Sequence, residues 1–114
     1  MKTKLTSICA ALMLLSSSLV HAAEVSPVID SKSCDAPKYP KSALMNEETG
    51  TVVLGYLIGA DGKVMDSRVD KSSGSKALDK AALTALALCK FKPGNKDGKV
   101  EQMWTKVEFV WKLE

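Results

Sequence analysis

The chain has little of what most enzyme active sites are built from. It contains one histidine, His21, three cysteines and only two each of Trp, Tyr and Phe, and it has no glycine-rich phosphate loop. Because His21 lies in a segment that we expect to be removed, acid–base chemistry would depend on carboxylates alone. Asp66 and Asp70, with Arg68 between them, are more simply explained as a solvent-exposed ladder on a strand. The sequence therefore predicts no enzymatic activity and no small-molecule substrate.

The sequence also lacks the ligand patterns of common metal and cofactor sites. The stretches "ADGK" and "NKDGK" contain fragments of a calcium loop, but neither has its spacing or its terminal glutamate. We therefore expect no metal ion and no cofactor.

Residues 1–22 are typical of a cleaved signal peptide. Two lysines precede an apolar run from Leu5 to Val20, which is short for a membrane span, and small residues follow it. We expect cleavage after Ala22 or one residue later, and export to the periplasm; an uncleaved anchor is the alternative. Sequencing the N-terminus of the exported protein distinguishes the two.

Charge and length limit the function of the remaining chain. Without Lys2 and Lys4, 14 basic side chains face 13 acidic ones, so the net charge falls from +3 to +1. Such a balance gives no electrostatic reason to expect nucleic-acid binding. About 92 residues remain, which suits a single domain with a modest core.

Cys34 and Cys89 are the cysteines that remain once Cys9 is removed with the leader. In an oxidising compartment two thiols usually pair, and closing this loop would stabilise the fold by about 4 kcal/mol. We expect a Cys34–Cys89 disulfide. A reactive thiol or half of a metal site is the alternative, and a mass gain of two hydrogens on reduction tests the pairing.

Hydrophobic periodicity predicts an α+β domain with a helical layer on a small sheet. Residues 23–33 show no periodicity and are expected to form an extended arm, and the region after Pro93 is expected to form a polar loop. The expected elements, in chain order, are a short helix at 41–46 that buries Ala43 and Leu44, a central strand at 51–58, an Asp61-Gly62 hairpin turn, a half-exposed strand with Met65 and Val69 on one side, a helix capped by Ser75 and stopped by Pro93-Gly94, and a last strand at 103–113.

The final stretch, "QMWTKVEFVWKLE", alternates large apolar and charged residues as a strand at a sheet edge does. Trp104 and Trp111 are separated by an odd number of residues, so they lie on opposite faces of a regular strand. Trp111 belongs to the more apolar face and is predicted to lie in the core. Trp104 is predicted to be exposed and available to a partner.

Several fragments, taken in order, resemble the C-terminal domain of TonB, the energy-transducing protein of Gram-negative bacteria. They are "PKYPKSA", "GTVVL", "IGADGKV", "SSGSKALDKAAL", "FKPG" and the aromatic last strand. The resemblance covers residues 34–114. It implies two helices packed on a three-stranded antiparallel sheet whose last strand lies at an edge.

The resemblance also implies a function for that last strand. In TonB proper, it receives the short "TonB box" segment of an outer-membrane receptor as an added strand. Main-chain hydrogen bonds would then supply affinity, and alternate side chains would supply selectivity. The residues carried over to this role are Trp104, Lys106, Glu108, Val110 and Lys112, with Tyr39 of the "YP" segment as a weaker candidate.

The chain also departs from the family pattern. We expect neither the membrane helix nor the proline-rich periplasmic span of TonB proper, and the cysteine pair is an addition. Ser17 and His21 have the spacing of a family anchor motif, yet His21 stands at the expected cleavage site. Fold resemblance alone therefore does not imply energy transduction. The alternative function is a structural envelope domain, similar in shape to TolA, that dimerises through the same strand.

Overall fold

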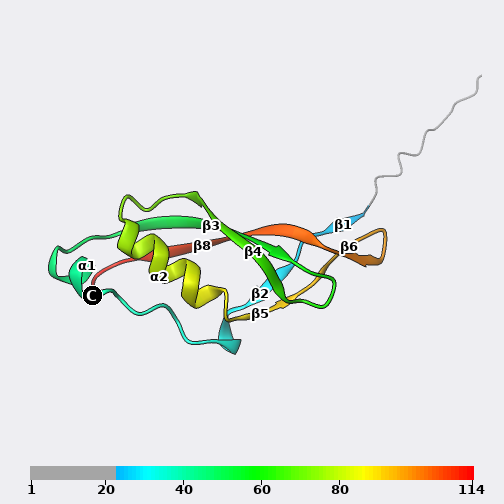
Figure 1. The fold of residues 1–114 in the computed structure, drawn as a ribbon, viewed down its shortest axis with the longest axis horizontal. Coiled ribbons are helices and arrows are strands. Elements are labelled where there is room, and N and C mark those ends of the chain that lie inside the picture. The colour runs from blue at the N-terminus through cyan, green and yellow to red at the C-terminus, as the bar shows by residue number, and fades with distance from the viewer. Residues whose placement is uncertain (1–22) are drawn as a thin grey trace, which may run out of the picture.

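The computed structural model describes residues 23–114, which form an α+β domain (Figure 1). The predictions on residues 1–22, including signal-peptide cleavage, lie outside the described residues. The helical elements and strands, in chain order, are β1 (Glu24–Val25), β2 (Val28–Asp30), the 3-10 turn η1 (Ser31–Ser33), α1 (Lys41–Met45), β3 (Gly50–Ile58), β4 (Val64–Lys71), α2 (Lys76–Leu86), β5 (Lys90–Lys92), β6 (Gly94–Lys96), β7 (Lys99–Glu101) and β8 (Met103–Trp111).

The principal sheet has three antiparallel strands in the order β4-β3-β8. β3 is the central strand, as its apolar residues on both faces predicted. Its pairing with β8 is regular over nine residues, from Gly50 opposite Trp111 to Ile58 opposite Met103. The two helices and this sheet agree with the expected fold. Two smaller sheets, β1-β6-β7 and β2-β5, were not predicted.

The hairpin between β3 and β4 turns at Asp61-Gly62, as predicted. Gly62 has φ +84°, a conformation that glycine adopts without steric cost. A Cβ atom at this position would also lie 2.7 Å from the Phe91 carbonyl oxygen. Glycine therefore serves both the turn and the close approach of β5.

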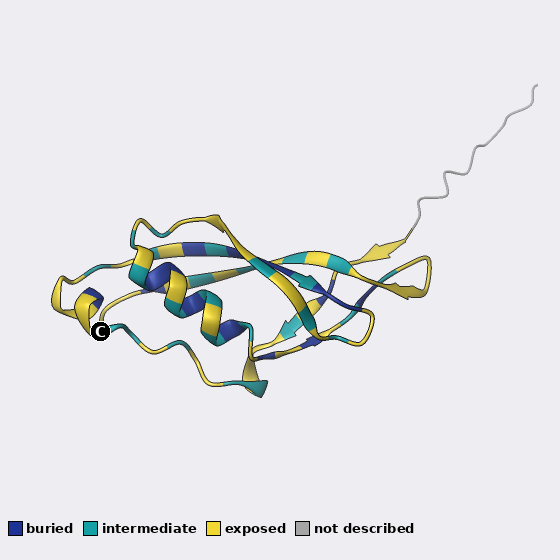
Figure 2. Cartoon of the chain, in the orientation of Figure 1, coloured by how far each residue is buried: buried dark blue, intermediate teal, exposed yellow. Residues whose placement is uncertain are grey.

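The inner face of the sheet is buried beneath α2 (Figures 1 and 2). Alternation along β3 places Val52, Leu54, Tyr56 and Ile58 in the core, and Figure 2 shows mostly buried and intermediate bands along this strand. The Tyr56 hydroxyl donates a hydrogen bond to the Leu83 carbonyl of α2 at 2.7 Å. Burial raises the pKa of Tyr56, so this hydroxyl stays protonated. The buried apolar residues are Ala43, Val52, Leu54, Tyr56, Ile58, Leu78, Ala82, Leu86, Cys89, Phe91 and Trp111.

A polar cluster fixes the start of α2. Ser75 is the N-cap, as predicted, and its Oγ accepts from the Leu78 N–H at 3.2 Å. Asp79, only 7% exposed, accepts from the Ser73 N–H at 2.8 Å and from the Ser72 hydroxyl. Burial acts to raise the pKa of Asp79, but these hydrogen bonds outweigh it and hold the pKa below its usual value.

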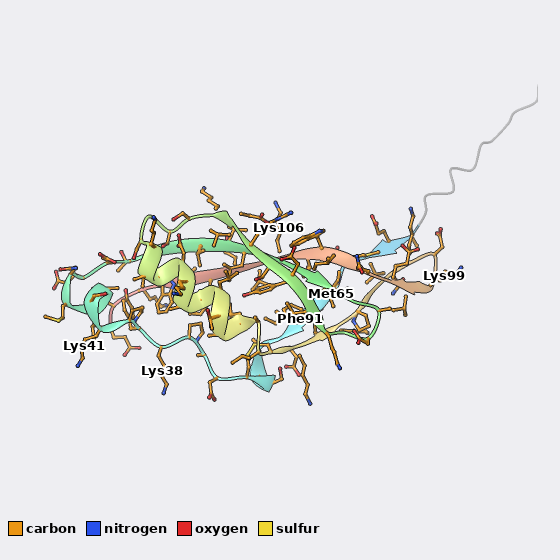
Figure 3. The ribbon with its side chains drawn as sticks, in the orientation of Figure 1. Lys38, Lys41, Met65, Phe91, Lys99 and Lys106 are labelled. Carbon is orange, nitrogen blue, oxygen red and sulfur yellow. A yellow bond between two sulfur atoms is a disulfide. The ribbon has the colours of Figure 1, made fainter. Side chains whose placement is uncertain are left out.

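The part of the inner face that lies beyond the end of α2 is covered by strands rather than by a helix. β2 pairs antiparallel with β5, with Ile29 opposite Phe91. The Phe91 ring packs against Tyr56, with ring centroids 5.5 Å apart, and Figure 3 labels it beneath the sheet. Residues 23–33 are therefore not a free arm, because β1 and β2 are hydrogen-bonded to segments some 60 to 70 residues later in the chain.

Two other sequence-based expectations were wrong around this second layer. The helix predicted to continue to Pro93 ends at Leu86, and the following residues form β5 instead. The expected polar loop contains β6 and β7, which form a hairpin that turns at Asp97 and Gly98. Pairing with the N-terminal segment overrides the local helix preference.

The side-chain predictions were partly wrong in the short helix and in β4. Ala43 is fully buried, but Leu44 is 49% exposed. Met65 and Val69 are also exposed, because β4 is an edge strand whose pairing with β3 is interrupted at two register shifts.

The Cys34–Cys89 disulfide is present. It lies beside the β2–β5 ladder, where the Lys90 N–H donates to the Ser33 hydroxyl at 2.7 Å. The bond thus ties the N-terminal strands to the segment that follows α2.

Candidate functional site

β8 is an edge strand within the part of the chain that the structure describes. It pairs with β3 along one flank, and no strand among residues 23–114 pairs along the other. A strand so placed presents backbone donors and acceptors to any chain that approaches it. The free flank is the geometric feature on which the sequence hypothesis depended.

The direction of these backbone groups follows from the hairpin. The Gly59 N–H donates to the Lys63 carbonyl at 2.9 Å, so residue 59 directs its backbone groups toward β4. The direction alternates along a regular strand, so the even-numbered residues of β3, Ile58 included, direct theirs toward β8. Their partners in β8 are the odd-numbered residues. The residues of β8 that direct N–H and C=O to the free flank are therefore Trp104, Lys106, Glu108 and Val110.

These four residues, called the β8 edge residues below, also share the outer face of the sheet. All four are exposed, with Trp104 at 36% and Val110 at 53%, whereas Trp111 on the inner face is 3% exposed. The sequence-based assignment of the two tryptophans to opposite faces is correct. Lys112 lies one residue beyond the end of β8 and is not part of the ladder.

Trp104 is less free than the sequence suggested. The Arg68 guanidinium stacks on its ring, with Cζ 4.0 Å from the centroid, and Arg68 Nε donates to Asp70 at 2.7 Å. To reach Trp104 from β4, the Arg68 side chain crosses Gly55 of β3, where a Cβ atom would lie 3.1 Å from Nε. Arg68 and Gly55 were missed because only the strand order brings them beside Trp104.

Tyr39 lies on the inner side of the sheet, near the end of β8. Its ring meets Trp111 edge-on at a centroid distance of 4.9 Å, and its hydroxyl donates to the Glu48 carbonyl. Both contacts fix the segment before α1 against the core. The structure therefore gives Tyr39 a packing role and does not bring it together with the β8 edge residues.

No helix within residues 23–114 combines the length and hydrophobicity needed to cross a membrane.

Comparison with known proteins identifies the domain. Residues 35–113 match the family described as Gram-negative bacterial TonB protein C-terminal. The chain is 38% identical over 78 residues to Protein tonB2 of Pseudomonas aeruginosa, covering 68% of this chain and 29% of that protein. It is 43% identical over 49 residues to Protein TonB of Haemophilus influenzae, covering 43% of this chain and 18% of that protein. The chain thus spans less than a third of the length of these relatives.

Two solved structures are similar to this fold. The solution structure of the Pseudomonas aeruginosa TonB C-terminal domain has a TM-score of 0.60 at 26% identity, covering 78% of this chain and 88% of that one. The Helicobacter pylori TonB C-terminal domain has a TM-score of 0.54 at 32% identity, covering 68% and 70%. This chain belongs to the TonB C-terminal domain family.

Proposed function

We propose that this domain binds an extended segment of a partner protein by strand addition along the free flank of β8. The observation that carries the proposal is the edge position of β8, whose N–H and C=O groups at alternate residues have no strand to pair with among the described residues. The domain would act in the periplasm, as an accessory of TonB-type transport through the outer membrane.

Affinity and selectivity would come from the same residues. Each β8 edge residue offers one N–H and one C=O to an incoming strand, and a ladder of such bonds is independent of the partner's side chains. The exposed side chains of Trp104, Lys106, Glu108 and Val110 would lie beside alternate side chains of the partner, where cross-strand pairs discriminate by about 0.2–1 kcal/mol each.

Family membership favours a TonB-box-like segment of an outer-membrane receptor as the partner. The relatives with this domain are TonB proteins. The resemblance to TonB implies that β8 corresponds to the strand that TonB proper uses for docking, and β8 keeps nine regularly paired residues against β3. Such a rigid template lowers the entropy cost of ordering an extended peptide.

Titration of the isotope-labelled protein with TonB-box-like peptides tests the proposal. Backbone amide shifts are expected to concentrate between Gln102 and Lys112. Val110→Pro removes a donor from the free flank and is expected to abolish them. Lys112→Ala, outside the ladder, is the matched control and should bind as the wild type does. Shifts that cluster away from β8 would refute strand addition.

A further inference from the structure

The tip of the β6–β7 hairpin holds Ala23, the first residue that the structure describes, by two hydrogen bonds. The Asp97 N–H donates to the Ala23 carbonyl at 2.7 Å, and the Ala23 N–H donates to the Asp97 carboxylate at 3.0 Å. Figure 1 shows β1 beside β6 at one end of the domain, and Figure 3 labels Lys99 on the same hairpin. Both hydrogen-bonding groups of the Ala23 main chain therefore bond to a single residue.

The Asp97 carboxylate takes the place of a backbone carbonyl in the ladder. Glu24 lies opposite Lys96, so Ala23 and Asp97 form the next pair. In a continued antiparallel ladder, the Ala23 N–H would bond to the carbonyl of its partner. Asp97 has φ +54° and Gly98 has φ +81°, and positive values at both central residues are what a type I′ turn requires. The backbone therefore leaves the ladder at Asp97, and the side chain supplies the acceptor.

This acceptor carries a charge that a peptide N–H does not need. An asparagine at position 97 would suit the turn equally, because Asn-Gly and Asp-Gly are both favoured in type I′ turns. Its side-chain oxygen would also accept the same hydrogen bond. The carboxylate differs by its negative charge, and hydrogen bonds between ionised groups are shorter and stronger than neutral ones. The site is therefore matched to a donor that carries a positive charge.

We propose that the peptide bond between Ala22 and Ala23 is cleaved, and that the α-ammonium group of Ala23 then binds the Asp97 carboxylate. The sequence patterns left two cleavage positions open, after Ala22 or one residue later. Hydrolysis consumes one water molecule: its oxygen joins the Ala22 carbonyl carbon to form a carboxylate, and its hydrogens convert the Ala23 nitrogen from an amide N–H to an ammonium group. This nitrogen already lies 3.0 Å from the Asp97 carboxylate, so the ion pair forms without rearrangement.

Cleavage one residue later would destroy the site. It would remove Ala23 and both of its hydrogen bonds to Asp97, and it would place the new ammonium group on Glu24, opposite the positively charged Lys96. β1 depends on such contacts because it has only two residues, both of them exposed, and so buries little apolar surface. Cleavage after Ala22 keeps the start of β1 bound to the hairpin.

Binding of the N-terminus also fixes the segment that lies under the start of β8. Pro27 passes so close to Gly94 that a Cβ atom at position 94 would lie 2.8 Å from Pro27 Cδ. The Thr105 hydroxyl of β8 donates to the Pro27 carbonyl at 2.9 Å. The ion pair at Ala23 therefore holds the free end of a segment that is bonded to β8. It involves no partner protein and does not rest on the proposed function.

Expression of the full chain and purification of the exported protein test both parts of the proposal. The intact mass should match a chain that begins at Ala23. The N-terminal amine is then converted to its ¹³C-dimethyl derivative, which keeps one N–H, and is titrated by NMR. Asp97→Asn should lower the pKa of this amine, because it removes the negative charge but keeps an acceptor oxygen and a favoured turn sequence. Hydrogen exchange of the residue-97 amide, corrected for intrinsic rates, should become about two- to fivefold faster in this variant.

Asp61→Asn is the matched control. It makes the same change in the other Asp-Gly turn of the chain, where the Asp61 carboxylate accepts from the Lys63 N–H, and it should leave the pKa of the N-terminal amine unchanged. The other charged side chains of β1 and of the hairpin are the same in all three proteins, so the comparison isolates Asp97. They are Glu24, Lys96, Lys99 and Glu101.

Two results would overturn the proposal. The first is an exported chain whose mass begins at Glu24 or includes the leader. The second is an N-terminal amine whose pKa is the same in the wild type and in Asp97→Asn, even when the chain begins at Ala23. Circular dichroism should be alike for all three proteins, because both altered side chains are exposed, so misfolding does not obscure the comparison.

Discussion

The direction of the backbone groups along β8 can be tested by placing one proline at each of two valines. Val110 directs its N–H to the free flank, and Val107 directs its N–H to Leu54 of β3. Each change replaces a valine side chain and removes one backbone N–H donor. The two sites differ in the direction of the lost donor and in packing, because Val107 packs against the core whereas Val110 is 53% exposed; Val107→Ala, which keeps the N–H, measures the packing part.

The expected costs differ in size. Proline is tolerated on an edge strand where its missing N–H faces solvent, so Val110→Pro should cost about 1 kcal/mol, mainly from lost strand preference. Val107→Pro removes a ladder hydrogen bond and leaves the Leu54 carbonyl without its donor, which costs about 1–3 kcal/mol on top of the lost strand preference. The difference is large beside a total stability of about 5–15 kcal/mol for a domain of this kind.

Urea denaturation followed by circular dichroism measures both free energies of unfolding. A midpoint for Val110→Pro close to that of the wild type, with a much lower midpoint for Val107→Pro, supports the assignment. Equal losses, or a greater loss at Val110, would show that the even-numbered residues bond to β3. The odd-numbered residues of β8 would then face the free flank, and the assignment of binding to Trp104, Lys106, Glu108 and Val110 would be wrong.

Three further changes test the surroundings of the site. Asp79→Asn removes a carboxylate whose pKa is held below its usual 3.8 by hydrogen bonds from Ser72 and Ser73. A carboxylate with a depressed pKa stabilises the folded state above pH 3.8, and this stabilisation is lost as the pH falls through the folded-state pKa. The difference in unfolding free energy between the wild type and the variant should therefore narrow as acid titrates Asp79. Replacing both Cys34 and Cys89 by serine should lower the unfolding free energy by about 4 kcal/mol, because it opens a loop with a sequence separation of 55. Arg68→Ala should increase acrylamide quenching of Trp104 fluorescence at little cost to stability.

Each of these expectations has a contradicting outcome. A gap that is constant from pH 7 to pH 2 would mean that the Asp79 carboxylate has the same pKa in the folded and unfolded states. An unchanged melting temperature after loss of the disulfide would mean that β1 and β2 are fixed by their ladders alone. Unaltered quenching would mean that Arg68 does not cover the Trp104 ring in solution.

The elements built from strong local patterns were predictable from the sequence. Alternation over β3 placed Val52, Leu54, Tyr56 and Ile58 on one buried face, and the structure confirms it. The same reasoning assigned Trp111 to the core. These predictions succeeded because burial on one face of a strand fixes a period of two that no neighbouring element alters.

The second layer could not be predicted because its signals are not local. β1, β2, β5, β6 and β7 have two or three residues each, which is too short for any period to show. They exist because distant segments pair, as Ile29 does with Phe91. The stack of Arg68 on Trp104 was missed for the same reason, since it requires the β4-β3-β8 order and a glycine at position 55.

The geometry of an antiparallel edge explains why so few residues carry the proposed function. In a regular strand, one residue in two directs its backbone to a given flank, and one residue in two directs its side chain to a given face. The two alternations are locked in phase, so in β8 the same four residues have their backbone groups on the free flank and their side chains on the outer face. Changes to these side chains should therefore alter partner choice while the core, built from the other residues of β8, stays intact.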